Sequence, residues 1–459
     1  MKNNGCLLMP RLFLFLVQIV IVLSGCVNRE EQNKDSIKIK VATAAKHLVG
    51  HDSMVIAGSI QAGYAHGEEA PIRTTALVID DGETKLCIIT CDVTKVDREF
   101  TDDVAKKIEA ECGIPFENIL FSASHTHHAP ATVGIHGYSR DENFVSSMKG
   151  AMFTVASEAN EKLRKAPESS MYFWLGQEAT VGQNSRLLLS DSTVNWAGPR
   201  DDAIRPTGTF DPELPVIAFK SADEELQALL FNHSTHNIGS RKGRVRSPGF
   251  YGLAAQELEQ ELGGNCLFLL GAAGSVHALA LTVDEKVFRI KEAVKDAYNK
   301  AEKKEISKLV SVKEEFKYKV RKFNEEEEDK AVSHYCHKRG HPESTIETFR
   351  TRRKELAQHQ GEVRKTWLQV MQIGEVAIVG VSGELFNDLG IEIKRLSPFR
   401  YTYIVGLAND YIGYIPDEKG FDLGGYQVWT GAHSLVSKGT GEAIVDRAVE
   451  ILNELYKEQ

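Results

Sequence analysis

The segment NILFSASHTHHAPA, residues 118–131, places His125, His127 and His128 at the end of an apolar run. If a strand continues as far as His127, its side chains alternate, so His125 and His127 share one face and His128 points elsewhere. Strand positions two apart are separated by about 6–7 Å. The two imidazoles could bind one metal ion together, or one could bind a metal while the other reaches a substrate. We expect a metal or catalytic site here, and a structural role for His128.

Other apolar segments also end in polar side chains that could do chemistry. These side chains are Asp92, His233, Ser275, His277, Glu384, Asn409 and Tyr414. Sites in open α/β sheets gather beyond the carboxyl ends of the strands. Although they are far apart in the sequence, we expect these residues to meet the histidines in one crevice. Two roles stay open for Asp92, which could orient a ligand histidine or cap a turn.

The order of the elements favours an α/β fold, with a mixed sheet core and flanking helices. Residues 76–93 have the pattern of a hairpin around an Asp-Gly turn. Residues 101–112 have helical spacing, with Thr101 as candidate N-cap and Gly113 just past the end. A strand over 118–125 follows, and strand, helix, strand is typical of an α/β core. Further hairpins are expected at 214–234 and 367–386, and further helices at 247–264 and 442–458.

The N-terminus has the features of a bacterial lipoprotein signal. A basic start and an apolar run lead to LSGC, which ends at Cys26 and resembles a lipobox. We expect residues 1–25 to be a signal peptide and Cys26 to carry the lipid that anchors an exported protein to a bacterial membrane, on its periplasmic side or at the cell surface. Residues 26–39 are expected to form a flexible tether, followed by one folded domain over 40–459. A plain signal anchor and a cleaved signal without lipid are the alternatives.

The composition excludes some classes of partner. The formal net charge is −9 over 459 residues, without the basic excess of a global nucleic-acid binder. Two of the seven cysteines belong to the signal, and the remaining five are scattered, which does not favour a disulfide framework. We therefore expect no nucleic-acid partner, and the sequence leaves the oligomeric state open.

Several motifs together resemble the neutral ceramidases, over most of residues 50–430. SASHTHHAP resembles the family's THTHSGP segment, and IQAGYAHGEEAPIRTTALVI its N-terminal Gly-Tyr-Ala segment with the strand that follows. LLFNHST is similar to its second histidine strand, SPGFYGLAAQELE to its Gly-Tyr-Ala helix start, and VSGELF to its Gly-Glu-Phe turn. ANDYIGYIPDEKGFDLGGYQ resembles a stretch with two tyrosines twelve apart, as Tyr414 and Tyr426 are here. The resemblance implies a ceramidase-like zinc hydrolase domain over residues 40–459.

The resemblance also implies roles for individual residues. It assigns one zinc ion four protein ligands, which are His125, His233, Glu384 and Tyr414. His127 would face the substrate and act as proton carrier, and Tyr426 would help to stabilise the oxyanion. Arg186 lies near a family Asn-Arg-Ser motif, offset by one position. Asp92 is a candidate to orient a ligand histidine.

Two departures from the family pattern bear on the substrate. The family loop Gly-Asp-Val-Ser-Pro-Asn is replaced by Gly-Ser-Val-His-Ala-Leu, so that Ser275 and His277 stand where the family has aspartate and serine. Ser275 could be a nucleophile, although it lacks the G-x-S-x-G context. His277 could carry a proton or form a wall of the pocket. We also expect no C-terminal β-sandwich domain of the kind found in full-length ceramidases.

These expectations favour a zinc-dependent hydrolase that cleaves an amide, an N-acyl bond, with zinc-activated water. Its partner would be a small-molecule or lipid substrate with an acyl bond. One alternative keeps the metal site but acts as an esterase, deacylase or lactonase on a glycan-derived substrate. Another is a surface-anchored binding protein that has lost catalysis.

Overall fold

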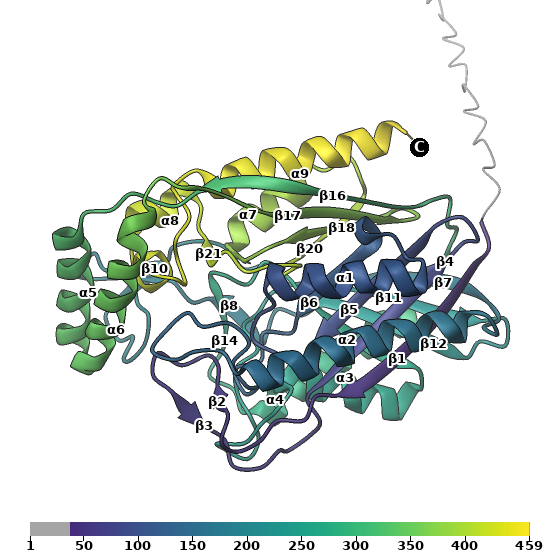
Figure 1. Ribbon diagram of the computed structural model, residues 1–459, viewed down its shortest axis with the longest axis horizontal. Helices are drawn as coiled ribbons and strands as arrows, with labels where there is room; N and C mark the ends of the chain where they lie inside the picture. The colour runs from purple at the N-terminus through teal and green to yellow at the C-terminus, as the bar shows by residue number, and fades with distance from the viewer. Residues whose placement is uncertain (1–36, 459) are drawn as a thin grey trace, which may run out of the picture. The chain divides into compact units, whose positions relative to one another are not determined.

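The computed structural model describes residues 37–458, and the signal peptide, Cys26 and most of the expected tether lie outside the described residues. A large mixed sheet forms its centre (Figure 1). The strands of this sheet run in the order β13-β12-β11-β7-β1-β4-β5-β6, with β15 paired to β7. Their bounds are β1 Ile39–His47, β4 Arg73–Asp80, β5 Lys85–Cys91, β6 Ile119–Ala123, β7 Glu168–Gln177, β11 Glu213–Ser221, β12 Leu226–His233, β13 Asn265–Leu270 and β15 Glu302–Lys304. The pairs β5–β6 and β12–β13 are parallel and the others are antiparallel.

A second sheet of four strands, in the order β16-β17-β18-β20, packs on the first. Its strands are β16 Leu309–Lys319, β17 Val363–Ile373, β18 Val376–Val381 and β20 Tyr401–Val405. Alternate residues of each strand divide between two cores. Leu77 and Ile79 of β4 contact the same core as Met371 and Ile373 of β17, whereas Ala76 of β4 faces the helices on the other side. The two sheets therefore share one apolar interior, as the period-two alternation of strands requires.

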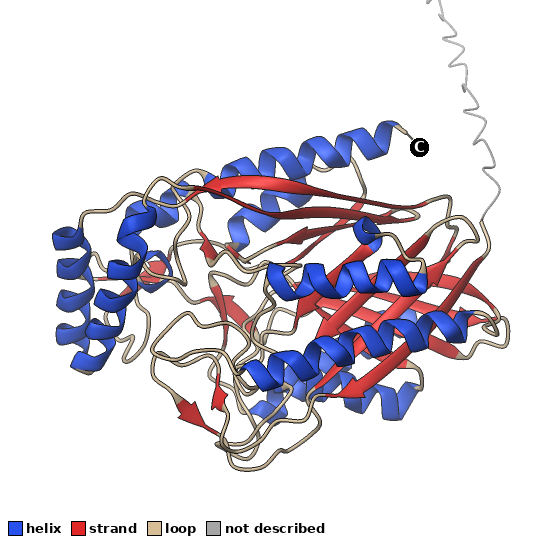
Figure 2. Ribbon diagram, viewed as in Figure 1, coloured by secondary structure: helices blue, strands red, loops and turns tan. Residues whose placement is uncertain are grey.

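Helices cover the outer faces of the two sheets, which makes four layers (Figures 1 and 2). The large sheet carries α1 Arg98–Cys112, α2 Glu142–Leu163, α3 Gly249–Leu262 and α4 Val283–Lys300. The small sheet carries α7 Asn387–Leu396 and α9 Thr440–Lys457. In Figure 1 the pair α5 Glu325–Arg339 and α6 Glu343–Leu356 stands to the left of the sheets, near α8 Glu418–Leu423. No helix within residues 37–458 is long and apolar enough to cross a membrane.

Short ladders and turns occupy the end of the molecule where the site lies. They comprise β2 Val55–Ile56 with β3 Gly63–Tyr64, β8 Gly182–Asn184 with β14 Val276–Ala278, β9 Leu187–Leu189 with β10 Ala203–Pro206, and β19 Glu384–Leu385 with β21 Tyr414–Ile415. Single 3-10 turns are formed elsewhere by Phe116–Asn118, at the start of β6, and further along the chain by Ala357–His359 and Tyr426–Val428. Most of these ladders follow directly on a strand of the two sheets, so they extend the sheets toward the site.

The expected α/β class, with a mixed sheet and flanking helices, is confirmed, and so is the hairpin of β4 and β5. Helix α1 begins a turn earlier than expected, because the Asp97 side chain accepts the N–H of Glu99 as N-cap. Thr101 instead lies buried in the helix and donates its hydroxyl to the Asn409 carbonyl. The helix ends at Gly113 in the left-handed region, as its sequence predicts.

The strand expected over 118–125 is shorter, Ile119–Ala123, so the condition that it continues to His127 is not met. Strand β6 ends at Ala123, where its ladder partner β5 ends at Cys91. His125 then adopts a φ of 59°, in the left-handed region that few residues other than glycine visit. The two imidazoles are therefore placed by a turn, and the alternation of a strand does not set their direction.

Candidate metal centre

Four side chains from separate strand ends meet in the interior. His125 follows β6, His236 follows β12, Glu384 opens β19 and Tyr414 opens β21. We call these four residues the donor cluster. Glu384 and Tyr414 are register partners in the parallel pair of β19 and β21, so the backbone itself sets them side by side. All four are buried.

Both histidines of the donor cluster direct Nε2 at its centre. Nδ1 of His125 lies 2.8 Å from the carbonyl oxygen of Thr94. Nδ1 of His236 lies 2.8 Å from the carbonyl oxygen of Val276 and 3.0 Å from that of Ala273. Because a carbonyl oxygen only accepts, Nδ1 donates its proton in each ring and Nε2 keeps a lone pair. This is the state in which a histidine coordinates a metal through Nε2.

Oε2 of Glu384 is the atom on which the cluster converges. It lies 3.4 Å from Nε2 of His125 and 3.2 Å from Nε2 of His236, and the phenol oxygen of Tyr414 lies 3.2 Å from the latter nitrogen. Oε2 is buried and has no hydrogen-bond donor. Apart from the Tyr414 hydroxyl, which can donate to Nε2 of His236, these facing lone pairs have no proton between them, which is unfavourable unless a cation lies among them. Two imidazoles, a carboxylate and a phenol are nitrogen and oxygen donors of the kind that zinc takes, so these residues fit a zinc ion.

The electrostatics of Glu384 favour its ionised form. Burial acts to raise the pKa of this carboxyl, whereas His125 and His236 in their protonated forms, together with Lys95, lower it well below its ordinary value. With both imidazoles neutral, the charge of Lys95 still favours the carboxylate. Its other oxygen, Oε1, accepts the hydroxyl of Tyr411 at 3.0 Å. The carboxylate is thereby fixed at one oxygen and left open at the other, which is the arrangement that a ligand needs.

His127 lies beside the cluster, with its Nε2 at 3.4 Å from Nε2 of His125. Burial, followed by the neighbouring His125 and His236, lowers the pKa of His127 well below its ordinary value, so the ring is neutral near pH 7. The loop at Gly58 packs on this ring: a Cβ at that position would lie 2.5 Å from the imidazole, and the backbone there has a φ of +106°. Glycine at position 58 therefore lets the loop hold His127 in place.

The structure leaves His233 out of the donor cluster, contrary to what the resemblance implies. Its Nδ1 lies 2.5 Å from the hydroxyl of Tyr251 and its Nε2 lies 3.0 Å from the carbonyl oxygen of Glu178, so both ring nitrogens are occupied. His236, three residues further on, takes the place assigned to it. His233 is the last residue of β12, whereas His236 lies beyond the strand, where the chain turns toward β14. The sequence NHSTH contains both histidines. Which of them reaches the donor cluster depends on where β12 ends, and this strand ends at His233.

Tyr426 lies in a group of rings next to the donor cluster, which we call the aromatic wall. This wall consists of His136, Trp196, Phe349, Tyr426, Trp429 and His433. Trp196 stacks on Tyr426 at 4.5 Å between ring centroids, and the Tyr426 hydroxyl lies 3.2 Å from Nε2 of His136. The rings of Tyr426 and Tyr414 are 6.0 Å apart, so the wall adjoins the cluster. Tyr426 is therefore within reach of a group bound there.

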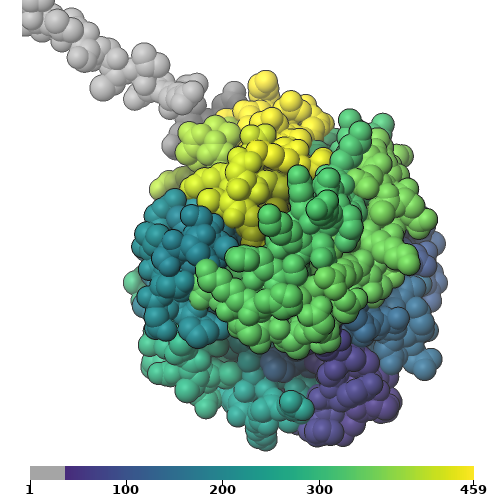
Figure 3. Space-filling model, turned by 90° about the vertical axis from the view of Figure 1, so that its left-hand side faces the viewer, coloured from purple at the N-terminus to yellow at the C-terminus, as the bar shows by residue number. Residues whose placement is uncertain are grey.

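The helices α5 and α6 hold the aromatic wall in position. Tyr335 of α5 accepts the N–H of Trp196, and Glu328 accepts the hydroxyl of Thr430. Arg352 of α6 donates to the carbonyl of His136. Figure 3 looks at this end of the molecule, with the helices in green at its centre and a recess between them and the purple segment around β2 and β3. The helix pair thus covers the side of the site that Tyr426 occupies.

Arg186 does not reach the donor cluster. Its guanidinium donates to Oε1 of Gln427 at 3.0 Å and to the carbonyls of Gly420 and Gly424 at 3.1 and 2.7 Å. Burial lowers its pKa to about 10. All these acceptors belong to the 420–427 segment, which carries Tyr426, so Arg186 helps to hold that tyrosine in position.

Ser275 and His277 belong to the loop in which the sequence departs from the ceramidase pattern. Both lie close to the donor cluster, but they make different contacts. Oγ of Ser275 accepts the first backbone N–H of α7, that of Asn387, at 3.0 Å, and among the described residues no side-chain base contacts it. This geometry disfavours Ser275 as a nucleophile, since a nucleophile needs an adjacent base. His277 packs against His236 with ring centroids 4.2 Å apart, and burial lowers its pKa well below the ordinary value. His277 therefore lines the cluster on the side of His236.

Asp92 caps a strand and does not touch a ligand histidine. Its Oδ2 accepts the backbone N–H of Arg73 at 3.1 Å. Burial raises its pKa from 3.8 to about 6. The carbonyl of Thr94 holds His125 instead, so a backbone group does what we assigned in one reading to this carboxylate.

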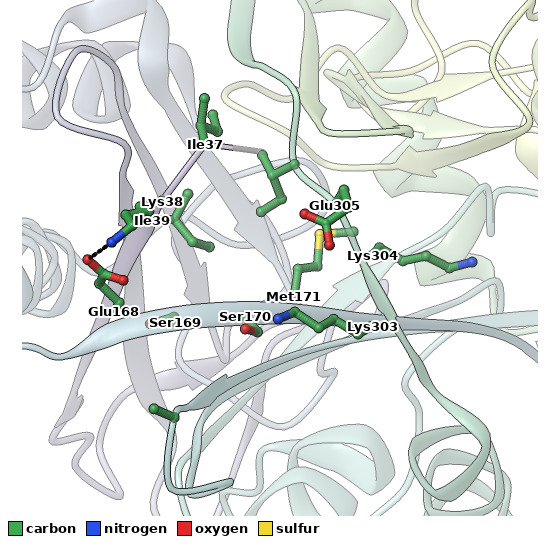
Figure 4. A pocket seen from close by; sticks show the side chains of 12 residues that line it. Ile37, Lys38, Ile39, Glu168, Ser169, Ser170, Met171, Lys303, Lys304 and Glu305 are labelled. Carbon is green, nitrogen blue, oxygen red and sulfur yellow. Dashed lines mark hydrogen bonds and ion pairs between the residues drawn. The ribbon is translucent and has the colours of Figure 1, made fainter. Parts of the chain in front are cut away.

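Two hollows on the surface differ in their relation to the cluster. One of about 390 Å³ is lined by His127 and His128 together with Ser59, Tyr64 and Arg244, so it opens toward the site. The hollow of about 210 Å³ in Figure 4 is lined by residues of β1, β7 and β15, where Lys38 pairs with Glu168 at 3.0 Å. No residue of the donor cluster lines this second hollow, so it has no part in the site.

Comparison with known proteins agrees with this architecture. No protein-family model and no curated protein matches the sequence. Among solved structures, the neutral ceramidase from Pseudomonas aeruginosa superposes with a TM-score of 0.70 at 17% identity, over 92% of this chain and 75% of that chain. A ceramidase complexed with C2 superposes with a TM-score of 0.68 at 16% identity, over 92% of this chain and 76% of that chain. The chain therefore has the fold of the neutral ceramidases, which confirms the resemblance at the level of the fold.

Proposed function

We propose that this protein is a zinc-dependent hydrolase that cleaves an N-acyl amide bond. The observation that carries the proposal is the convergence of Nε2 of His125, Nε2 of His236 and the unpartnered Oε2 of Glu384, at 3.2–3.4 Å from that oxygen. His125, His236, Glu384 and Tyr414 would hold the ion. The ceramidase fold supports the amide as the bond that is cleaved, because the two solved neighbours are ceramidases by name.

Zinc bound by such donors supplies an activated water at neutral pH and polarises a carbonyl oxygen. The protein's own residues then divide the remaining work. His127, a neutral imidazole beside His125, accepts a proton from the attacking water and delivers it to the leaving nitrogen. The water oxygen forms the new bond to the carbonyl carbon, the C–N bond breaks, and a carboxylate and a protonated amine leave. An amine departs only when it is protonated, so this transfer is required.

Tyr426 donates its hydroxyl to the carbonyl oxygen as negative charge develops there. Arg186 keeps the tyrosine in place through the 420–427 segment. The aromatic wall excludes water from that side, which strengthens a hydrogen bond to a developing charge. His277 packs on the ring of His236, with ring centroids 4.2 Å apart, and so covers one side of this ligand.

The location of the protein remains part of the proposal. The lipobox-like LSGC sequence supports a lipid on Cys26 and an anchor on a bacterial membrane. Mass spectrometry of the membrane fraction tests this. A peptide that begins at Cys26 with added acyl mass supports the anchor, and a soluble chain that retains residues 1–25 contradicts it.

The function is tested by metal analysis coupled to a substrate panel. The purified protein is assayed for zinc and for hydrolysis of matched N-acyl amides, O-acyl esters, acylated sugars and lactones. We expect one zinc per chain and cleavage of amides that stops on chelation and returns with zinc. Cleavage of esters or lactones alone would favour the glycan-directed alternative, and bound zinc without any turnover would favour the binding protein.

A further inference from the structure

A buried lysine lies at the donor cluster. Lys95 follows β5, one residue after Thr94, whose carbonyl orients His125. Its own carbonyl accepts the Thr132 hydroxyl at 2.6 Å, and the residue is only 4% exposed. Its ammonium lies 5.0 Å from the centroid of the Tyr411 ring, and the Tyr411 hydroxyl donates to Glu384. The charge of Lys95 therefore lies close to the donor cluster, next to the tyrosine that binds Glu384.

Within residues 37–458 no hydrogen bond or ion pair joins this ammonium to another protein group, and it lies over the face of the Tyr411 ring. Burial lowers the pKa values of His127, His136 and His433, and the charge of Lys95 adds to the effect at each. The charge of Lys95 therefore acts on histidines of both the donor cluster side and the aromatic wall. Burial lowers the pKa of the Lys95 ammonium, and the charge of Glu384 acts to raise it, although the Glu384 side chain is directed at the histidines.

Two other lysines whose ammonium groups lie over aromatic rings differ from Lys95 in having a hydrogen-bond acceptor. Nζ of Lys286 lies over the Phe250 ring and donates to the carbonyl of Ile238. Nζ of Lys313 lies over Phe116 and donates to the carbonyl of Ile119. Because a buried cation without a hydrogen-bond acceptor is costly, an ammonium in this position favours a ligand that supplies one.

A second cationic side chain, Arg244, lines the hollow that opens toward the donor cluster. Arg244 lines the 390 Å³ hollow together with His127, is exposed, and its guanidinium makes no ion pair with the part of the chain that the structure describes. Ser59 and Gln61 also line the hollow, so its wall is partly polar. An anion that enters by this hollow meets positive charge at its mouth and again beside the cluster.

We propose that Lys95 binds an anionic group of the substrate, so that the preferred substrates are N-acyl compounds whose amine part carries a carboxylate, such as N-acyl amino acids. This rests on the proposed function for the hydrolysis, but the binding of the anion depends only on the chain.

The test compares N-hexanoylglycine with N-hexanoylethanolamine, which differ in a carboxylate against a hydroxymethyl group. Lys95→Met removes the charge at similar length, and Lys286→Met is the matched control. Binding to zinc-stripped protein is measured by calorimetry, and hydrolysis is measured on the zinc-loaded protein. We expect the wild type and Lys286→Met to prefer N-hexanoylglycine by about tenfold in both assays, and Lys95→Met to lose that preference.

Equal binding of the two compounds by the wild type, or an unchanged preference in Lys95→Met, would overturn the proposal. Hydrolysis of both amides at equal rates would support the proposed function and overturn this inference. A carboxylate preference in binding that depends on Lys95, without any hydrolysis, would support the inference and count against the function. If Lys95→Met does not fold, the exposed Arg244→Gln decides: a loss confined to N-hexanoylglycine supports an anion path, and an equal loss for both compounds overturns it.

Discussion

The donor cluster and the aromatic wall lie side by side but are built in opposite ways. In the donor cluster, backbone carbonyls hold the outer nitrogens of both histidines, and Oε2 of Glu384 faces their inner nitrogens without a hydrogen-bond partner. In the aromatic wall, the Tyr426 hydroxyl has His136 as partner and its ring is stacked on Trp196. The donor cluster is arranged to bind an ion at its centre, whereas the aromatic wall is arranged to fix the position of the Tyr426 hydroxyl.

The difference follows from the elements that position the side chains of each region. The donor cluster depends on strand ends of the two packed sheets, and β19 pairs Glu384 directly with Tyr414. The aromatic wall depends on α5, α6 and the guanidinium of Arg186. Changes in the first region should therefore remove the metal, and changes in the second should leave the metal and slow the reaction.

The largest effect is expected from the ligands themselves. Glu384→Gln and His236→Ala should each remove zinc and lower hydrolysis by more than about 100-fold, because each takes away a donor directed at the centre. Atomic absorption and an amide assay measure the two effects. His233→Ala is the control, and it should keep zinc because both nitrogens of that ring are bonded elsewhere. Zinc retained in His236→Ala but lost in His233→Ala would reverse the assignment.

His127 should separate the metal from proton transfer. His127→Ala is expected to keep zinc and to lose about 100-fold or more in kcat, since a positioned general acid–base group contributes on this scale. Zinc content and steady-state kinetics check the result together. Undiminished amide turnover in this variant would remove the role that we give to the imidazole.

Tyr426 should show the behaviour of the aromatic wall. Tyr426→Phe keeps the ring stacked on Trp196 and deletes only the hydroxyl, so we expect zinc content and folding to be unchanged and kcat to fall by about 100-fold. Kinetics on a single amide substrate measure the change. If the variant loses zinc instead, the two regions are not separable in the way we describe.

Ser275 lies near the donor cluster without belonging to it. Ser275→Ala removes the acceptor of the Asn387 N–H at the start of α7, so we expect about 1 kcal/mol of lost stability and kcat within about twofold of the wild type. Urea denaturation and kinetics test the two halves. A collapse of turnover with normal zinc content would make Ser275 a nucleophile after all.

The buried carboxyl of Asp92 should make the free energy of unfolding depend on pH. Its pKa is raised from 3.8 to about 6 by burial, so the folded protein holds this proton more tightly than the unfolded chain. The stability contributed by the proton is full below about pH 4 and is lost as the pH rises through about 6. Between these values the wild type should lose up to about 1.4 kcal/mol per pH unit relative to Asp92→Asn. Identical pH slopes in denaturation would contradict the assigned pKa.

Much of the fold could be predicted from local patterns. Alternating apolar residues located the hairpin of β4 and β5, and Gly113 marked the end of α1 because only the left-handed region closes that helix. The start of the same helix was missed, since Asp97 and Thr101 are both good N-caps and the burial of Thr101 is a tertiary effect.

The site was predicted less completely, for reasons that are specific to each residue. The strand ends indicated His125, Glu384 and Tyr414, and the structure brings these three together. The choice between His233 and His236 depends on whether the last residue of β12 turns toward the centre, which spacing does not reveal. Lys95 was missed because lysine after a strand is ordinarily a solvated residue, and its burial is set by packing against Tyr411.

The account is tested most directly by anomalous X-ray scattering at the zinc edge, on crystals of the protein grown with zinc. It predicts one strong peak, coordinated by His125, His236, Glu384 and Tyr414, with His127 beside it and His233 still bonded to Tyr251. A peak coordinated by His233, or no peak among these four side chains, would contradict it.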